Sequence, residues 1–157
     1  MAGSLRINRD APATALAELH IDAPVQIVWS TLADIESWPD WNPDVSSASI
    51  QGPIADGTVF RWKAGGMSIR SRLEDVSAPA RLSWTGSTFG TKAVHVSSFV
   101  SEGDRTRALS EESFEGPLPW LLRVPVRRML ENSLTKGLAA LKVESERRAR
   151  AEPHNWR

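Results

Sequence analysis

A histidine and a glutamate in the second half of the sequence are the side chains best suited to chemistry. His95 and Glu112 lie in two runs of alternating apolar and polar residues, joined by the turn sequence "SEGDRT". If Gly103 takes the first position of a two-residue type II′ turn, Glu102 faces Arg105, and counting back along both strands brings His95 opposite Glu112. Opposite residues of an antiparallel pair have Cβ atoms about 5 Å apart. The sequence therefore predicts that the imidazole and the carboxylate meet on one face of a sheet.

The predicted pair fits proton transfer. Arg107 and Glu111 fall on the opposite face, which their charge assigns to solvent, so His95 and Glu112 point inward. An imidazole beside a carboxylate in an apolar interior can move protons to and from a carbonyl-bearing substrate, and these two are the predicted catalytic residues. Two other interpretations stay open: the pair is structural, or it holds one polar group of a ligand. A register slip of one residue would turn one of them outward.

Large apolar side chains recur at alternate positions of the same runs, which puts them on one face of a strand. We predict that they line a ligand chamber with residues of the C-terminal third: Phe60, Trp62, Met67, Ile69, Trp84, Phe99, Phe114, Trp120, Met129, Leu130 and Leu134. Trp62 and Trp84 are the preferred wall residues, because an indole N–H also needs a polar partner. Ordinary core packing is the alternative for these rings.

Three further tryptophans fall within the stretch "VWSTLADIESWPDWNPDV", residues 28–45. Trp29 lies on the apolar face of a helix of about ten residues. Two prolines limit the rest of this stretch to a second short helix and a loop. Trp38 and Trp41 are therefore predicted at an open end of the sheet, facing the segment around Trp120, where they gate or seal the chamber.

Strands and one long helix must position these side chains. Alternation and turn residues predict seven strands near residues 14–21, 45–51, 58–64, 67–76, 80–86, 92–100 and 105–115. From about Val126 to residue 150 the period becomes helical, and Pro125 should start or kink the helix. Its apolar face comprises Leu122, Val126, Leu130, Leu134, Leu138 and Leu141.

This order of elements predicts an α+β fold. Two short helices separate the first two strands, and the long helix follows the last strand. An antiparallel sheet of this kind has one face to bury, and only the C-terminal helix is long enough to cover it. We therefore expect a curved sheet wrapped around that helix, with a hollow between them in which a ligand binds.

The sequence also resembles a known superfamily. The segments "IDAPVQIVWSTLADIESWPDWNPDV", "GTVFRWK", "LSWTG", "HVSSF" and "EESFEGPLPWLLRVPVRRML" are similar to the START-like helix-grip (SRPBCC) superfamily. Within it, the polyketide cyclase/dehydrase and lipid-transport group is the best match, over about residues 13–147. The resemblance implies the helix-grip fold and an elongated apolar cavity between sheet and C-terminal helix. Roles in the superfamily range from ring cyclisation to lipid carriage and hormone sensing, so the fold alone does not choose between them.

Composition narrows the functional classes. The 157 residues suit one domain, with ends expected to fray at about 1–12 and 150–157. Nineteen basic and nineteen acidic residues give no net field that would attract nucleic acid. The chain has no cysteine, its histidines at 20, 95 and 154 lack ligand-like spacing, and no phosphate-binding glycine motif occurs, so neither a metal nor a cofactor is predicted. Without a signal peptide or an apolar run of about 20 residues, we expect a cytoplasmic monomer or homodimer with no membrane span.

Three functional hypotheses follow. The first is binding of a small hydrophobic ligand, either aromatic and polyketide-like or an acyl or lipid molecule, between the sheet and the C-terminal helix. The second is a polyketide cyclase or dehydratase type of enzyme, in which His95 and Glu112 transfer protons. The third is an interaction module similar to the chaperone-activating members of the superfamily.

Overall fold

The structure, a computed structural model, describes residues 3–152. Its elements follow one another as β1 (Ala13–Ile21), α1 (Val25–Ala33), the 3-10 turn η1 (Ile35–Ser37), α2 (Trp38–Trp41), β2 (Val45–Ile50), β3 (Val59–Ala64), β4 (Met67–Ser77), β5 (Arg81–Thr88), β6 (Thr91–Glu102), β7 (Arg105–Glu115), α3 (Pro117–Leu121) and α4 (Arg123–Ala151). The tail at 153–157, predicted to fray, and the histidine at 154 lie outside the described residues.

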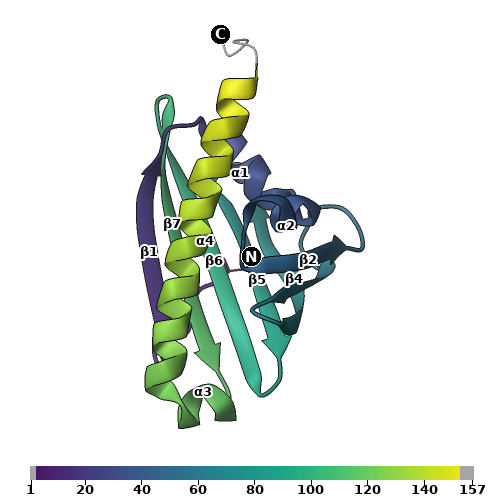
Figure 1. The fold of residues 1–157 in the computed structure, drawn as a ribbon, viewed down its shortest axis with the longest axis vertical. Helices are drawn as coiled ribbons and strands as arrows, with labels where there is room; N and C mark the ends of the chain where they lie inside the picture. The colour runs from purple at the N-terminus through teal and green to yellow at the C-terminus, as the bar shows by residue number, and fades with distance from the viewer. Residues whose placement is uncertain (1–2, 153–157) are drawn as a thin grey trace.

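The seven strands form one antiparallel sheet in the order β1-β7-β6-β5-β4-β3-β2. Strands β2 to β7 follow one another as hairpins, and β1 pairs with β7, the last strand. Figure 1 shows the long helix α4 lying across one face of the curved sheet, over the side where β1, β7 and β6 run. The predicted helix-grip fold, with two short helices between the first two strands, is confirmed.

Helix α4 begins earlier than the sequence predicts. It starts at Arg123, and Pro125 lies within its first turn, where a backbone N–H has no partner inside the helix. The preceding residues form the separate helix α3. Leu130, Leu134, Leu138 and Leu141 are buried, as the predicted apolar face requires. Leu122 stays exposed, because it lies before the helix and beyond the part that covers the sheet.

The core consists of two apolar clusters. The larger joins α1, the aromatic residues of β3, β5 and β6, and the C-terminal half of α4 through Leu138 and Leu141. The smaller joins β1 to the N-terminal half of α4 through Ala13, Ala15, Leu130 and Leu134. Helix α4 is thus fixed to the sheet at two places along its length.

Trp38 occupies the larger cluster and does not lie at an open end, so that prediction is wrong. Its side chain is 3% exposed and its indole N–H donates to the Leu32 carbonyl at 2.9 Å. Its ring lies 5.3–5.6 Å from the rings of Phe60, Trp62 and Trp84. The short helix α2 brings this tryptophan inward against the sheet, while Trp120 lies on α3 at the lower tip of the molecule, away from α2 (Figure 1).

The segment before β1 contacts the sheet face opposite α4. The backbone N–H of Asn8 donates to Ser113 Oγ at 3.1 Å, and Arg81 donates to the Leu5 carbonyl. Val96, which points to this face, is 2% exposed. Part of the N-terminal segment predicted to fray therefore has partners on the sheet. Within residues 3–152, no helix has both the length and the apolar character that crossing a bilayer requires.

Glu144 links α4 to the end of α1 through arginines. Its carboxylate accepts hydrogen bonds from Arg147 at 2.7 and 2.9 Å and from Arg148 at 2.9 Å. Arg148 also donates to Asp34 at 3.3 Å and to Ser37 at 3.2 Å. The hydrogen bonds from Arg147, opposed by burial and reinforced by Arg148, lower the pKa of Glu144 from 4.5 to about 2.

We expect Glu144→Gln to lower the free energy of unfolding by about 1–2 kcal/mol at neutral pH. The folded-state pKa is the lower one, so this stabilisation is complete above pH 4.5 and is lost as the pH falls toward 2. The value is less than the full shift would give, because Arg147 is exposed and water screens its charge. Urea unfolding should separate the variant from the wild type at neutral pH and bring the two together near pH 2. Glu131→Gln, at an exposed pair, is the control, and a difference that persists in acid would contradict the assignment.

Candidate functional site

The β6–β7 hairpin sets the geometry of the site. Gly103, the first residue of the turn, has a φ of 72°. Asp104, the second, has no positive φ, since within residues 3–152 only glycines do. A positive φ at the first position alone is the pattern of a type II′ turn. Glu102 pairs with Arg105, and the register then runs without a shift to His95 opposite Glu112. The predicted register is confirmed.

His95 lies between three partners. Its Nδ1 is 3.4 Å from Glu112 Oε2, and its Nε2 is 2.9 Å from the hydroxyl of Ser97. The ring stacks on Trp84 of β5, with centroids 4.2 Å apart and planes 6° from parallel. A carboxylate only accepts hydrogen bonds, so Nδ1 carries the proton and Nε2 accepts from Ser97 in the neutral ring. These contacts fix both the orientation and the tautomer of His95.

Small side chains surround this pair on the inner face of the sheet. Besides Trp84 opposite His95 and Phe114 next to Glu112, the register puts small residues at the neighbouring inward positions: Ala15, Ala17, Gly86, Ala93, Ser97 and Ser110. The side chains of His95 and Glu112 remain 11% and 16% exposed. Both side chains point to the inner face of the sheet, so this exposure means that water reaches them on that face.

The other predicted site residues divide into three groups. The structure buries Phe60, Trp84, Phe99, Leu130 and Leu134 and leaves Trp62, Ile69 and Phe114 half-buried. Met67, Trp120 and Met129 are 42%, 63% and 42% exposed, so they do not join the buried groups. Met67 begins β4 after a tight turn, Trp120 lies on α3, and Met129 sits beside the buried face of α4.

The buried groups do not form one continuous wall. Phe60, Trp62 and Trp84 gather around Trp38, whereas Phe114, Leu130 and Leu134 pack with β1 in the smaller cluster. The indole N–H of Trp62 donates to Ser71 Oγ at 3.1 Å, so a partner within the sheet satisfies it. The pair of His95 and Glu112 lies on the strands between the two groups.

Sequence reasoning did not assign a role to Ser97. It shares the inward parity of His95 two residues along the strand, and this spacing was the available signal. Among residues 3–152, no group of three or more histidine, cysteine, aspartate and glutamate side chains is arranged to hold a metal ion.

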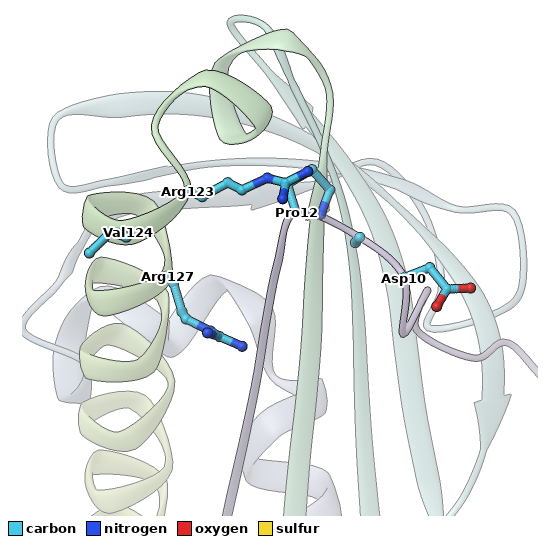
Figure 2. Close-up of a pocket in the computed structure, with 6 residues that line it drawn as sticks. Asp10, Pro12, Arg123, Val124 and Arg127 are labelled. Atoms are coloured by element: carbon cyan, nitrogen blue, oxygen red, sulfur yellow. The ribbon is translucent and has the colours of Figure 1, made fainter.

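Two surface hollows lie beside the N-terminal half of α4, and neither is lined by His95 or Glu112. One, of about 370 Å³, is lined by Asp10, Ala11, Pro12, Arg123, Val124 and Arg127. Figure 2 shows Arg123 and Arg127 extending from α4 toward the segment that precedes β1. The other, of about 600 Å³, runs along β1 between Leu16 and Glu131. Neither hollow contains a residue that the sequence predicts to bind a ligand.

Comparison with known proteins identifies the family. The family model described as "Polyketide cyclase / dehydrase and lipid transport" matches residues 13–146. The chain therefore belongs to this family. The match covers every element from β1 to most of α4, and the suspected membership in the START-like superfamily is confirmed. No curated protein matches the chain.

Solved structures share the fold of this family member. The Zhui aromatase/cyclase from Streptomyces sp. R1128 aligns with a TM-score of 0.77 and 20% identity, over 88% of this chain and 96% of its own. A START superfamily protein from Mycobacterium smegmatis aligns with a TM-score of 0.74 and 19% identity, over 85% and 97%. A hypothetical protein from Helicobacter pylori aligns with a TM-score of 0.77 and 18% identity, over 92% and 99%. At these identities the likeness concerns the fold alone.

Proposed function

We propose that the chain binds a small, largely apolar aromatic or acyl molecule between the sheet and α4, with one polar group of that molecule held by Glu112 and His95. The observation that carries the proposal is a polar pair that water reaches, on an inner sheet face where six of the neighbouring residues have small side chains. A buried ion-forming pair needs a polar partner, and small neighbours leave room for one. Membership in a family described by cyclisation and lipid transport supports the same class of ligand.

Glu112 is the group that would contact the ligand. Oε2 of its carboxylate lies near His95, while Oε1 has no hydrogen bond to any residue of the described part of the chain. Both ring nitrogens of His95 face protein partners. A hydroxyl or enol group of the ligand can therefore donate to Glu112, while His95 holds the carboxylate in place and the apolar body packs against Trp62 and Ile69.

Filling the space beside the pair tests the binding proposal. Ala93 points to the inner face next to His95, and Ala93→Trp should weaken ligand affinity by at least about tenfold, since an added indole occupies the volume the ligand needs. Native mass spectrometry of the protein as purified shows whether a ligand is retained. A naphthol probe measured by fluorescence polarisation gives the affinity.

Val100→Trp is the matched control for this experiment. Val100 lies on the same strand, points to the outer face and is 47% exposed, so the same indole is added away from the site. It should leave the affinity unchanged. Equal affinities of the wild type and Ala93→Trp, together with no retained mass, would exclude a ligand site over His95.

A second function, acid–base catalysis of the cyclase or dehydratase type, is favoured by the continuous chain Glu112–His95–Ser97. A carboxylate that contacts a substrate and an imidazole bonded to a hydroxyl can remove one proton and return another. The shared fold of the Zhui aromatase/cyclase supports this alternative. No observation at the site favours the interaction-module hypothesis.

A further inference from the structure

Exposed apolar side chains gather at one end of the molecule. We call this surface the apolar pole and define it as Phe89, Leu118, Trp120, Leu121, Leu122 and Val124, each between 37% and 89% exposed. Isolated exposed apolar residues are common, but a contiguous set marks a surface that meets another apolar phase. The pole is not used by the ligand site proposed above, which lies on the inner face of the sheet.

Two elements build the pole and hold it together. Trp120 and Leu121 lie on α3, and Leu122 and Val124 lie where α3 passes into α4. Phe89 is on the β5–β6 turn, which α3 contacts through the Leu118 N–H and the Gly90 carbonyl at 3.5 Å. Gly116 closes this contact: it has a φ of 119°, and a Cβ there would lie 2.5 Å from the Gly90 carbonyl oxygen.

The shape of this end favours a flat partner over a groove. Figure 1 shows α3 at the lower tip of the long axis, at the opposite end from the C-terminal end of α4. The apolar side chains are thus presented on a protruding tip. A tip with Trp and Leu side chains can enter the interface of a lipid bilayer, the layer that tryptophan prefers.

The charge around the pole selects the kind of bilayer. Residues 116–130 contain Arg123, Arg127 and Arg128 and no acidic residue, although the whole chain has equal numbers of basic and acidic groups. Arg127 has a loose contact with Glu131 at 3.9 Å, and both side chains are exposed. Arginines beside an inserting apolar surface bind the phosphates of anionic lipids.

We infer that the apolar pole docks the protein on anionic lipid bilayers, with α3 and Phe89 in the interface and the arginines on the headgroups. This inference concerns an interaction surface and does not depend on the proposed ligand.

Co-sedimentation with large unilamellar vesicles tests it. The wild type should bind vesicles of phosphatidylcholine with about 30% phosphatidylglycerol at least about tenfold more tightly than pure phosphatidylcholine vesicles, and half-molar salt should remove most of that difference. The variant Trp120→Ser/Leu121→Ser and the variant Arg123→Glu/Arg128→Glu should each lose at least about tenfold in affinity for the anionic vesicles.

Matched controls separate docking from general effects of polarity and charge. Val143→Ser removes an apolar side chain that is 68% exposed near the other end of α4. Arg61→Glu/Arg70→Glu reverses two exposed arginines that face each other on β3 and β4. Both controls should bind as the wild type does, and circular dichroism should show that all variants are folded.

Two further results bear on the inference. Quenching of Trp120 by brominated lipid, taken as the difference between the wild type and Trp120→Phe, would support insertion of the pole. The inference is overturned if the wild type fails to bind anionic vesicles, or if the pole variants bind as well as the controls do. It is also overturned if sedimentation velocity shows a dimer that the pole variants abolish without any vesicle binding, since the occupant would then be a second copy.

Discussion

Replacing Trp38 with alanine should lower the free energy of unfolding by about 3–5 kcal/mol, the range for removing a large buried ring. Trp38 is almost fully buried, and it contacts the rings of Phe60, Trp62 and Trp84 from one position. Alanine leaves a cavity among three rings that the strands hold in place, so neighbours cannot close it. The Leu32 carbonyl also loses the hydrogen bond that it accepts from the indole N–H.

Trp120→Ala is the matched control for the Trp38 prediction, because it deletes the same ring from an exposed position. It should change stability by less than about 0.5 kcal/mol. Urea denaturation followed by far-ultraviolet circular dichroism gives both values. Similar midpoints for the two variants would show that the aromatic cluster around Trp38 does not stabilise the fold.

The second large effect concerns the acid–base alternative. A suitable substrate is 4-hydroxy-4-phenylbutan-2-one, which loses water to give the conjugated enone benzylideneacetone. If the site catalyses this reaction, the carboxylate of Glu112 takes the proton next to the ketone and, as the protonated acid, gives it to the departing hydroxyl, while His95 Nδ1–H holds the carboxylate in place. Glu112→Gln should then lower the rate constant by about 10²–10⁴-fold, with little change in KM, because the amide keeps the shape and loses the base.

Further variants assign the steps. His95→Gln should also reduce the rate, whereas Val100→Trp, on the outer face, should not. The ultraviolet absorbance of the enone follows the reaction directly. If the wild type does not accelerate dehydration, or if Glu112→Gln leaves its rate unchanged, Glu112 does not catalyse this reaction. The binding proposal is unaffected by either result.

The strands and the hairpin register were predictable because they depend on local signals. Alternation identifies a strand, and Gly103 in a short polar turn fixes the pairing of the residues on both sides. That register carries His95 to Glu112 without any long-range information. The small residues beside the pair follow from the same parity, although sequence reasoning gave Ser97 no role.

The placement of Trp38 and of Met129 was not predictable in the same way. Trp38 lies in a proline-interrupted stretch, which has no period to show which ring points inward, and only the sheet opposite it decides. Met129 is adjacent to the buried Leu130 on α4, and whether that edge of the helix is covered depends on how far the sheet reaches. The start of α4 was missed because a proline is accommodated in a first turn as readily as before it.

The pairing of β1 with β7 has a consequence for synthesis of the chain. Among the strands of the sheet within residues 3–152, β1 is synthesised first, yet it pairs with β7, the last of them to be made. Until β7 emerges, both edges of β1 lack hydrogen-bonding partners, and such unpaired strands promote aggregation. Completion of the sheet thus requires contact between residues far apart in sequence, a topology that folds slowly compared with one built from local contacts. A nascent chain interrupted before Arg105 would expose β1, so premature termination should yield insoluble fragments.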